Sequence, residues 1–110
     1  MYKTMMSSLF GLWILLLAGA VFSETVWIDV RSGEEYQQSS IDGDLHIPYQ
    51  SIVADIEQYS IPKDAEIKLY CRSGGRAGKA KKSLEAAGYT RVVNVGGIDD
   101  ARNARDLSAE

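Results

Sequence analysis

The sequence predicts an α/β fold in which a parallel sheet carries helices on both faces. Short runs rich in β-branched and aromatic residues alternate along the chain with runs whose apolar residues recur at helical spacing. This order is typical of parallel strands joined by right-handed crossovers. The single cysteine, Cys71, ends one of the strand-like runs. Parallel sheets bind ligands beyond the carboxyl ends of their strands, so the fold class also indicates where a functional site should lie.

The first elements are a strand, a short helix and a second, brief strand. Residues 25–30, TVWIDV, are β-branched and aromatic, which is typical of a buried strand, and Trp27 is expected in the core. Ser32 and Glu35 have the spacing of a capping box, which predicts the start of a short helix. Residues 42–48 predict a turn and then a short strand that ends at a proline.

A helix and the cysteine-bearing strand follow. In residues 49–59 apolar side chains recur at helical spacing, and Ser51 is the candidate N-cap. Residues 66–71, EIKLYC, predict the next strand. The apolar face of the helix is expected to contain Ile52, Val53, Ile56 and Tyr59, and one face of the strand Ile67, Leu69 and Cys71.

The last elements are a longer helix, a strand and a polar tail. The helix is predicted over residues 76–87, with Ala77, Ala80, Leu84 and Ala87 on its buried face and Gly88 as the residue that ends it. Residues 91–95, RVVNV, predict a strand closed by two glycines. Residues 98–110 could form a polar helix that frays at its end. No repeat, low-complexity block or internal linker interrupts this order, which indicates one domain.

The first 23 residues have the pattern of a secretory signal peptide. Lys3 gives a short basic region, and residues 9–22 form an apolar run without charge. We expect cleavage after Ser23, which leaves residues 24–110 as the domain and places it in the periplasm or outside the cell. An uncleaved membrane anchor is the alternative, but the uncharged run is shorter than the roughly 20 residues that a spanning helix needs.

Composition limits the function classes and the partners. The formal net charge is −3, so a nucleic-acid partner is not expected, nor a stable membrane association after cleavage. A single cysteine excludes an intramolecular disulfide. Cys71 and His46 do not have metal-ligand spacing, and no dinucleotide fingerprint occurs, so neither a metal nor another cofactor is expected. His46 is expected to be structural rather than a general base, and the chain to be a monomer.

The segment LYCRSGGRAGKA around Cys71 has the features of an activated thiol. Helix N-termini and neighbouring cations lower the pKa of a cysteine, and Cys71 stands just before a predicted helix. Gly74 and Gly75 allow consecutive N–H groups to point inward and bind an anion, and Arg72 and Arg76 bracket them. A buried free thiol, a tight turn and solvated arginines could each explain one feature. Their combination predicts an active site with Cys71 as the nucleophile.

Five segments, in their order along the chain, resemble the single-domain rhodanese family. They are DVR (29–31), EEYQQSSIDGDLHIP (34–48), LYCRSGGRAGKA (69–80), LEAAGYTRV (84–92) and NVGG (94–97). With the signal peptide and the short length, the chain looks most like the small periplasmic phage-shock type of thiosulfate sulfurtransferase. It departs from the family at Ala77, where Ser or Thr is frequent, and after Gly97, where an aromatic residue is common.

The resemblance implies a sheet of about five parallel strands and a role for Cys71 as the carrier of sulfur in a persulfide. It also implies that Asp29 and Arg31 form an ion pair that fixes the first helix. The backbone amides of the loop are implied to bind the sulfur, which makes the following residues the candidate substrate-binding set: Arg72, Ser73, Gly74, Gly75, Arg76 and Ala77.

The expected reaction moves sulfur from thiosulfate to cyanide or a small thiol. Sulfite is a good leaving group, so the reaction needs no proton donor. A cysteine phosphatase or arsenate reductase is one alternative, but its loop is longer than the four residues between Cys71 and Arg76. A non-enzymatic sulfur carrier or redox module is the other alternative. The sequence leaves it open, because the same loop would hold a persulfide in either role.

Overall fold

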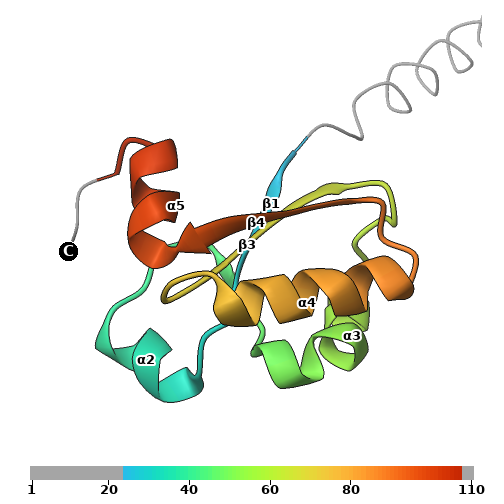
Figure 1. The fold of residues 1–110 in the computed structure, drawn as a ribbon, viewed down its shortest axis with the longest axis horizontal. Coiled ribbons are helices and arrows are strands. Elements are labelled where there is room, and N and C mark those ends of the chain that lie inside the picture. Colours follow the sequence, from blue (N-terminus) through green and yellow to red (C-terminus); the bar gives the residue numbers. More distant parts are fainter. Residues whose placement is uncertain (1–23, 108–110) are drawn as a thin grey trace, which may run out of the picture.

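The computed structural model describes residues 24–107 (Figure 1), so the predicted signal peptide, residues 1–23, lies outside the described residues. The elements in chain order are β1 (Val26–Asp29), α2 (Gly33–Gln38), β2 (Leu45–His46), the 3-10 helix η1 (Tyr49–Ser51), α3 (Ile52–Asp55), the 3-10 helix η2 (Ile56–Tyr59), β3 (Glu66–Cys71), α4 (Gly75–Ala86), β4 (Arg91–Gly97) and α5 (Ile98–Ala104). None of the helices in this described range is long and apolar enough to cross a membrane.

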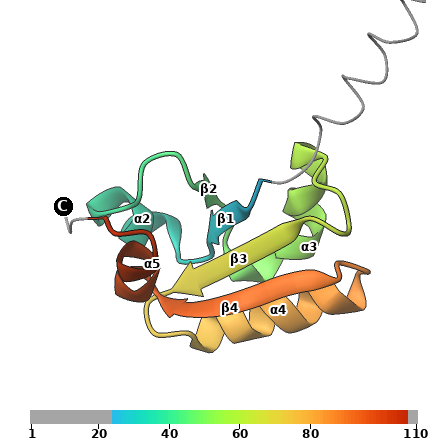
Figure 2. The ribbon, with the colours of Figure 1, turned by 90° about the horizontal axis from the view of Figure 1, so that it is seen from above.

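The four strands form one parallel sheet in the order β2-β1-β3-β4 (Figure 2). The α/β class and the parallel sheet are therefore confirmed. The strand number is four rather than the five or so that the family resemblance implied. β1 begins at Val26, next to the first described residues, which leaves no room ahead of it for a further strand within the described range.

Helices cover both faces of the sheet, as predicted. α3 and α4 lie on one face and α5 lies on the other, near the carboxyl ends of β3 and β4 (Figures 1 and 2). The larger core fills the space under α3 and α4, and it takes Ile67, Leu69 and Cys71 from the predicted face of β3. A smaller core of Ile41, Tyr70 and Ala101 lies on the α5 side. Cys71 therefore ends a central strand inside the core.

The expected single helix over residues 49–59 is instead three short pieces, η1, α3 and η2. Only Ile52 and Ile56 are buried, whereas Val53 and Tyr59 are 39% and 44% exposed. The 3-10 turns at both ends change the helical period, so side chains four residues apart face the sheet and the other two turn outward. Ser51 is not a side-chain cap, because its hydroxyl lies 3.5 Å from the Pro48 carbonyl in the preceding turn.

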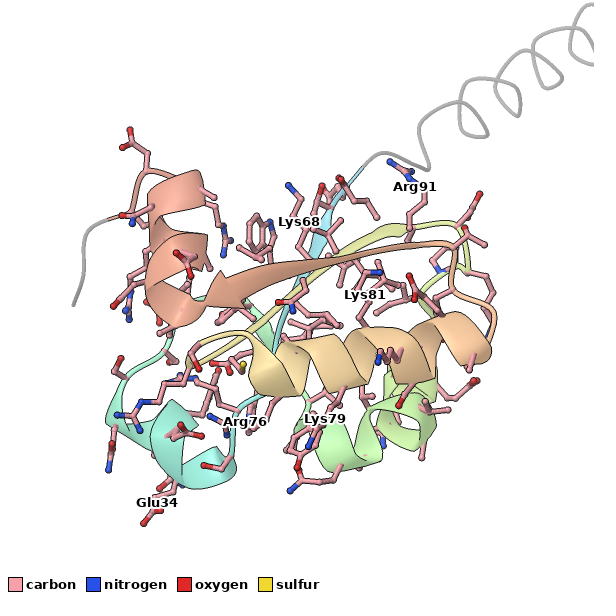
Figure 3. The ribbon with its side chains drawn as sticks, viewed as in Figure 1. Glu34, Lys68, Arg76, Lys79, Lys81 and Arg91 are labelled. Carbon is pink, nitrogen blue, oxygen red and sulfur yellow. The ribbon has the colours of Figure 1, made fainter. Side chains whose placement is uncertain are left out.

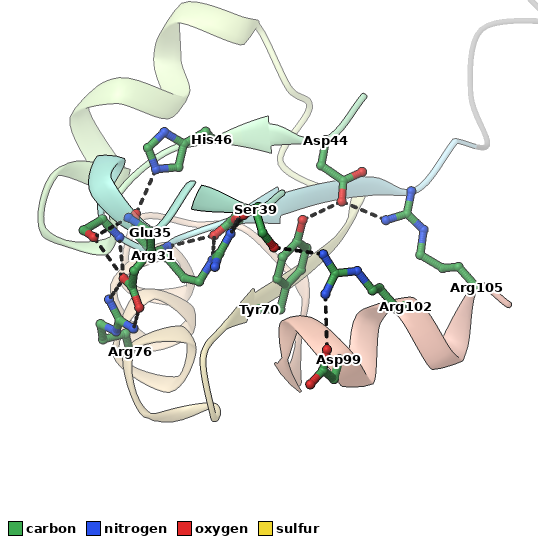
Figure 4. Close-up of polar contacts among 12 residues, drawn as sticks. Arg31, Glu35, Ser39, Asp44, His46, Tyr70, Arg76, Asp99, Arg102 and Arg105 are labelled. Carbon is green, nitrogen blue, oxygen red and sulfur yellow. Dashed lines mark hydrogen bonds and ion pairs between the residues drawn. The ribbon is translucent and has the colours of Figure 1, made fainter. Parts of the chain in front are cut away.

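α5 is more closely integrated into the fold than its polar sequence predicted. Ala101 is fully buried and Arg102 is only 7% exposed. The Arg102 guanidinium donates to the Ser39 hydroxyl at 3.2 Å and to Asp99 at 3.2 Å, which ties α5 to the end of α2 (Figure 4). α5 therefore covers this face of the sheet next to the end of α2.

A second connection joins α5 to the loop before β2. Asp44 accepts hydrogen bonds from the Tyr70 hydroxyl at 2.6 Å and from Arg105 at 2.7 Å (Figure 4). Burial raises the pKa of Tyr70, and the hydrogen bond to Asp44 raises it further. Trp27, which was expected in the core, is only half-buried, and the Arg105 guanidinium lies 4.2 Å from the centre of its ring.

The ion pair between Asp29 and Arg31 is confirmed, and it fixes α2. The Arg31 side chain donates to Asp29 at 2.8–3.1 Å and to the carbonyl of Ser39, the C-cap of α2, at 2.6 Å. Both side chains are buried. His46 connects the Arg31 backbone to α2, since its Nε2 contacts the Arg31 carbonyl at 2.8 Å and its ring stacks on Tyr36. These contacts give His46 a structural role.

We predict that Asp29→Ala lowers the free energy of unfolding by about 3–5 kcal/mol, because it leaves the buried Arg31 guanidinium without its carboxylate. Urea denaturation measures the change. Glu85→Ala is the matched control, since it removes the exposed ion pair with Lys81 and should cost about 1 kcal/mol or less. Equal losses in the two variants would contradict the structural role of the buried pair.

Candidate active site

Cys71 lies at the point where β3 ends and the chain turns into α4. It is the last residue of β3, and α4 begins at Gly75 after a short loop. Gly74 is the N-cap and has φ +104°, a backbone conformation that side-chain-bearing residues rarely adopt. The predicted strand-to-helix turn is therefore present, and a glycine makes it possible.

Backbone N–H groups surround the sulfur. Sγ accepts a hydrogen bond from the N–H of Gly74 at 3.0 Å and another from the N–H of Ala77 at 3.4 Å. Cys71 is only 1% exposed. Two of the residues predicted to form the site, Gly74 and Ala77, therefore contact the Cys71 sulfur through their main chain. The missing side-chain hydroxyl at Ala77 does not affect this contact.

The local electrostatics favour the thiolate. Burial by itself raises the pKa of the Cys71 thiol, because it removes water from the charged form. The nearby backbone N–H groups of Ala77, Ser73, Gly74 and Arg76 lower it by more, so the pKa lies below the ordinary value of a cysteine. The arrangement can hold an anionic sulfur in a buried place.

The two arginines of the loop have different surroundings. Arg76 donates to both carboxylate oxygens of Glu35, from Nη1 at 2.7 Å and from Nη2 at 2.9 Å (Figure 4). A guanidinium has five N–H donors, so Arg76 keeps donors for another anion. Arg72 is exposed, and within residues 24–107 it forms no ion pair. The structure therefore brings Arg76 next to a carboxylate, and leaves Arg72 at the surface.

Glu35 is a site neighbour that sequence reasoning missed. Its capping box with Ser32 was predicted and is present, but its contact with Arg76, 41 residues away along the chain, was not. The Arg76 guanidinium, followed by the N–H of Ser32, holds the pKa of Glu35 well below its usual range. One carboxylate thus both caps α2 and fixes the first turn of α4. No local pattern in the sequence signals this second contact.

A further cation lies one turn along α4. Lys79 is exposed, and its ammonium lies 5.9 Å from the centre of the Tyr49 ring. Figure 3 shows Arg76 beside α2 and Lys79 further along α4, on the side that faces η1. Two cations, Arg76 and Lys79, thus lie in the first two turns of α4, although the chain as a whole is acidic.

Within residues 24–107, no group of three or more His, Cys, Asp or Glu side chains could hold a metal ion. The polar groups nearest the sulfur are backbone N–H donors, which suit an anion rather than a cation. The site thus consists of a buried thiol, its main-chain donors and neighbouring cations.

The structure is that of an α/β protein with a parallel sheet and a buried cysteine before the N-terminus of a helix, where backbone N–H groups donate to the cysteine sulfur. The chain belongs to the rhodanese-like domain family, whose model matches residues 16–104. It is 38% identical over 86 residues to the thiosulfate sulfurtransferase PspE of Escherichia coli, which is 78% of this chain and 83% of that protein.

Two other matches agree with this family. A sulfurtransferase of Allochromatium vinosum is 38% identical over 76 residues, which cover 68% of this chain and 69% of that protein. A solved structure of a rhodanese with anions from E. coli superposes with a TM-score of 0.66 at 39% identity, and covers 70% of this chain and 91% of that one.

We predict that alkylation of Cys71 by iodoacetamide rises with pH at a midpoint below the value of about 8.5 that an ordinary thiol shows. The thiolate is the reactive form, so a lowered pKa moves the rise to lower pH. Cys71 is the only cysteine, so the rate reports this site alone. Protein unfolded in urea is the control and should return to the ordinary midpoint. A folded-state midpoint at or above that of the unfolded chain would contradict the geometry.

Proposed function

We propose that the protein is a thiosulfate sulfurtransferase that moves sulfur to cyanide or a small thiol through a persulfide on Cys71. The observation that carries this proposal is the buried Sγ held by the N–H groups of Gly74 and Ala77. The names of the E. coli and A. vinosum relatives support sulfur transfer as the reaction class.

In the first step, the Cys71 thiolate attacks the outer sulfur of thiosulfate. A sulfur–sulfur bond forms, and the bond to the sulfonate group breaks with its electron pair, so that sulfite leaves. The persulfide keeps the single negative charge that the thiolate had. No proton is transferred, which fits a chain whose only histidine, His46, is engaged by Arg31 and Tyr36.

In the second step, cyanide attacks the outer sulfur of the persulfide. Thiocyanate forms, and the electron pair of the broken sulfur–sulfur bond returns to Cys71 as the thiolate. A small thiolate acceptor would take the sulfur in the same way and leave as its own persulfide. Preorganised dipoles stabilise the anion at each stage, because they are already oriented before charge moves.

The proposed substrate-binding set is the loop from Arg72 to Ala77. Its N–H groups would hold the persulfide as they hold Sγ. Arg76 is proposed to donate to thiosulfate with the guanidinium donors that Glu35 does not use, and Arg72 to attract the dianion from the surface. Four residues between Cys71 and Arg76 make a short loop, which fits a single sulfur better than a tetrahedral phosphate.

We predict that Cys71→Ser abolishes transfer of sulfur from thiosulfate to cyanide without loss of cooperative folding. After treatment with thiosulfate, the wild-type protein should gain the mass of one sulfur on the peptide that contains Cys71, and cyanide should remove it. Loading without turnover would show a sulfur carrier instead of an enzyme. Residual turnover in the Ser variant would overturn the role of Cys71.

We predict that Arg76→Ala lowers kcat/KM for thiosulfate by about tenfold or more, because a charge-assisted hydrogen bond contributes roughly 1.5–3 kcal/mol and about 1.4 kcal/mol is tenfold. It should also raise the Cys71 thiol pKa, since a neighbouring cation is removed. Lys82→Ala, an exposed change further along α4, is the matched control and should leave both unchanged.

The double variant Glu35→Gln/Arg76→Ala separates two explanations of an Arg76 effect. If Arg76 binds thiosulfate, the double variant remains as slow as Arg76→Ala. If Arg76 only balances the charge of Glu35, removal of both charges restores the wild-type rate. Recovery in the double variant would therefore refute direct binding by Arg76.

We also propose that residues 1–23 are a signal peptide and that the mature domain, residues 24–110, is a periplasmic or secreted monomer without stable membrane association. The basic start, the apolar run and the small residues near Ser23 support this. The intact mass of protein from the exporting cell should correspond to a chain that begins near Glu24. Full-length chain recovered from the membrane fraction would contradict cleavage.

A further inference from the structure

The carboxyl end of β4 packs against the loop that follows Cys71, residues 72–74, here called the cysteine loop. A Cβ atom at Gly97 would collide with the carbonyl of Arg72, and a Cβ atom at Gly74 would lie 3.4 Å from the Cα of Gly96. Figure 2 shows the end of β4 beside the loop that leads from β3 into α4. Loop and strand therefore approach at backbone distance, and a shift of one moves the other.

The pairing of β3 with β4 is irregular at this end of β4. Leu69 pairs with Asn94, but Tyr70 pairs with Gly96, so one residue of β4 is left out of the register. Such a bulge bends a strand and leaves a backbone group without its ladder partner. Here the N–H of Gly96 donates to the side-chain oxygen of Asn94 at 3.0 Å. Asn94 thus stabilises the bulge from its own strand.

The other end of the same amide reaches the cysteine loop. Nδ2 of Asn94 donates to the carbonyl of Gly74 at 2.9 Å, and the N–H of Gly78 donates to that carbonyl at 2.9 Å. The N–H of Gly74 is the group that contacts Sγ at 3.0 Å. Both peptide groups of Gly74 are therefore fixed, one by the sulfur and the other by Asn94 and α4.

We propose that Asn94 is a positioning residue, which holds Gly74 so that the loop N–H groups point at the sulfur of Cys71. Gly74 has φ +104°. A glycine can adopt many backbone conformations, so its contacts must hold it in this one. A fixed carbonyl on Gly74 also fixes the first turn of α4, and hence the N–H of Ala77. The consequence for sulfur transfer rests on the proposed function.

The position requires an amide. One side of the group must accept from the N–H of Gly96, and the other must donate to the carbonyl of Gly74. A carboxylate offers only acceptors and would repel that carbonyl, whereas an aliphatic side chain of the same volume offers neither contact. The neighbouring Gly78 leaves the space for the amide, since a Cβ there would lie 3.4 Å from Nδ2.

The test compares Asn94→Leu and Asn94→Ala with the wild-type chain, and neither variant adds a charge. The measurement is the pH midpoint of alkylation of Cys71 by iodoacetamide. We expect both folded variants to shift the midpoint upward by about half a pH unit, because a less well oriented loop weakens the hydrogen bonds from Gly74 and Ala77 that favour the thiolate. Asn103→Ala, an exposed change on α5, is the matched control and should not shift it.

Alkylation needs no sulfurtransferase activity, so the comparison decides the role of Asn94 even if the wild-type chain fails to turn over thiosulfate. Where it does turn over, the same variants should lower kcat/KM in parallel with the shift. An unchanged midpoint in folded variants, with only a lower free energy of unfolding, would make Asn94 an ordinary stabilising residue and overturn the proposal. Failure of both variants to fold would overturn it in the same way.

Discussion

The structure of the site depends on one interaction, the hydrogen bonds from backbone N–H groups to the sulfur of Cys71. An anionic sulfur in the core would be costly without compensation, because burial removes its water. The N–H groups of Gly74 and Ala77 supply that compensation. They can do so only because β3 ends, a left-handed glycine turns the chain and α4 begins within a few residues. The rest of the fold holds this short segment, from the end of β3 to the first turn of α4, in its conformation.

Two contacts with distant parts of the chain hold the segment in place, and a third interaction supports one of them. Glu35 fixes Arg76 from α2, and Asn94 fixes Gly74 from β4. The buried pair of Asp29 and Arg31 sets the position of α2 itself. Each contact comes from an element that borders the carboxyl end of the sheet. The parallel topology therefore also positions the site, because it brings these elements together at one edge of the sheet.

The sequence predicted what is determined locally. The capping box of Ser32 and Glu35, the glycine that ends α4 and the strand that ends at Cys71 each depend on residues close in the chain. The pairing of Glu35 with Arg76 could not be predicted, because it joins residues 41 positions apart. The exposed Val53 was mistaken for a core residue, because an ideal helical period does not hold in a segment with 3-10 turns.

In the proposed function, main-chain dipoles are the chief support of the sulfur, and the arginines are proposed to bind the substrate. This claim is tested most directly by the amide resonances of Gly74 and Ala77, followed by NMR in labelled protein as pH is raised. The account predicts that both amide protons move downfield with the midpoint of Cys71 ionisation, because each then donates to an anion. Resonances that stay constant through that midpoint would contradict it.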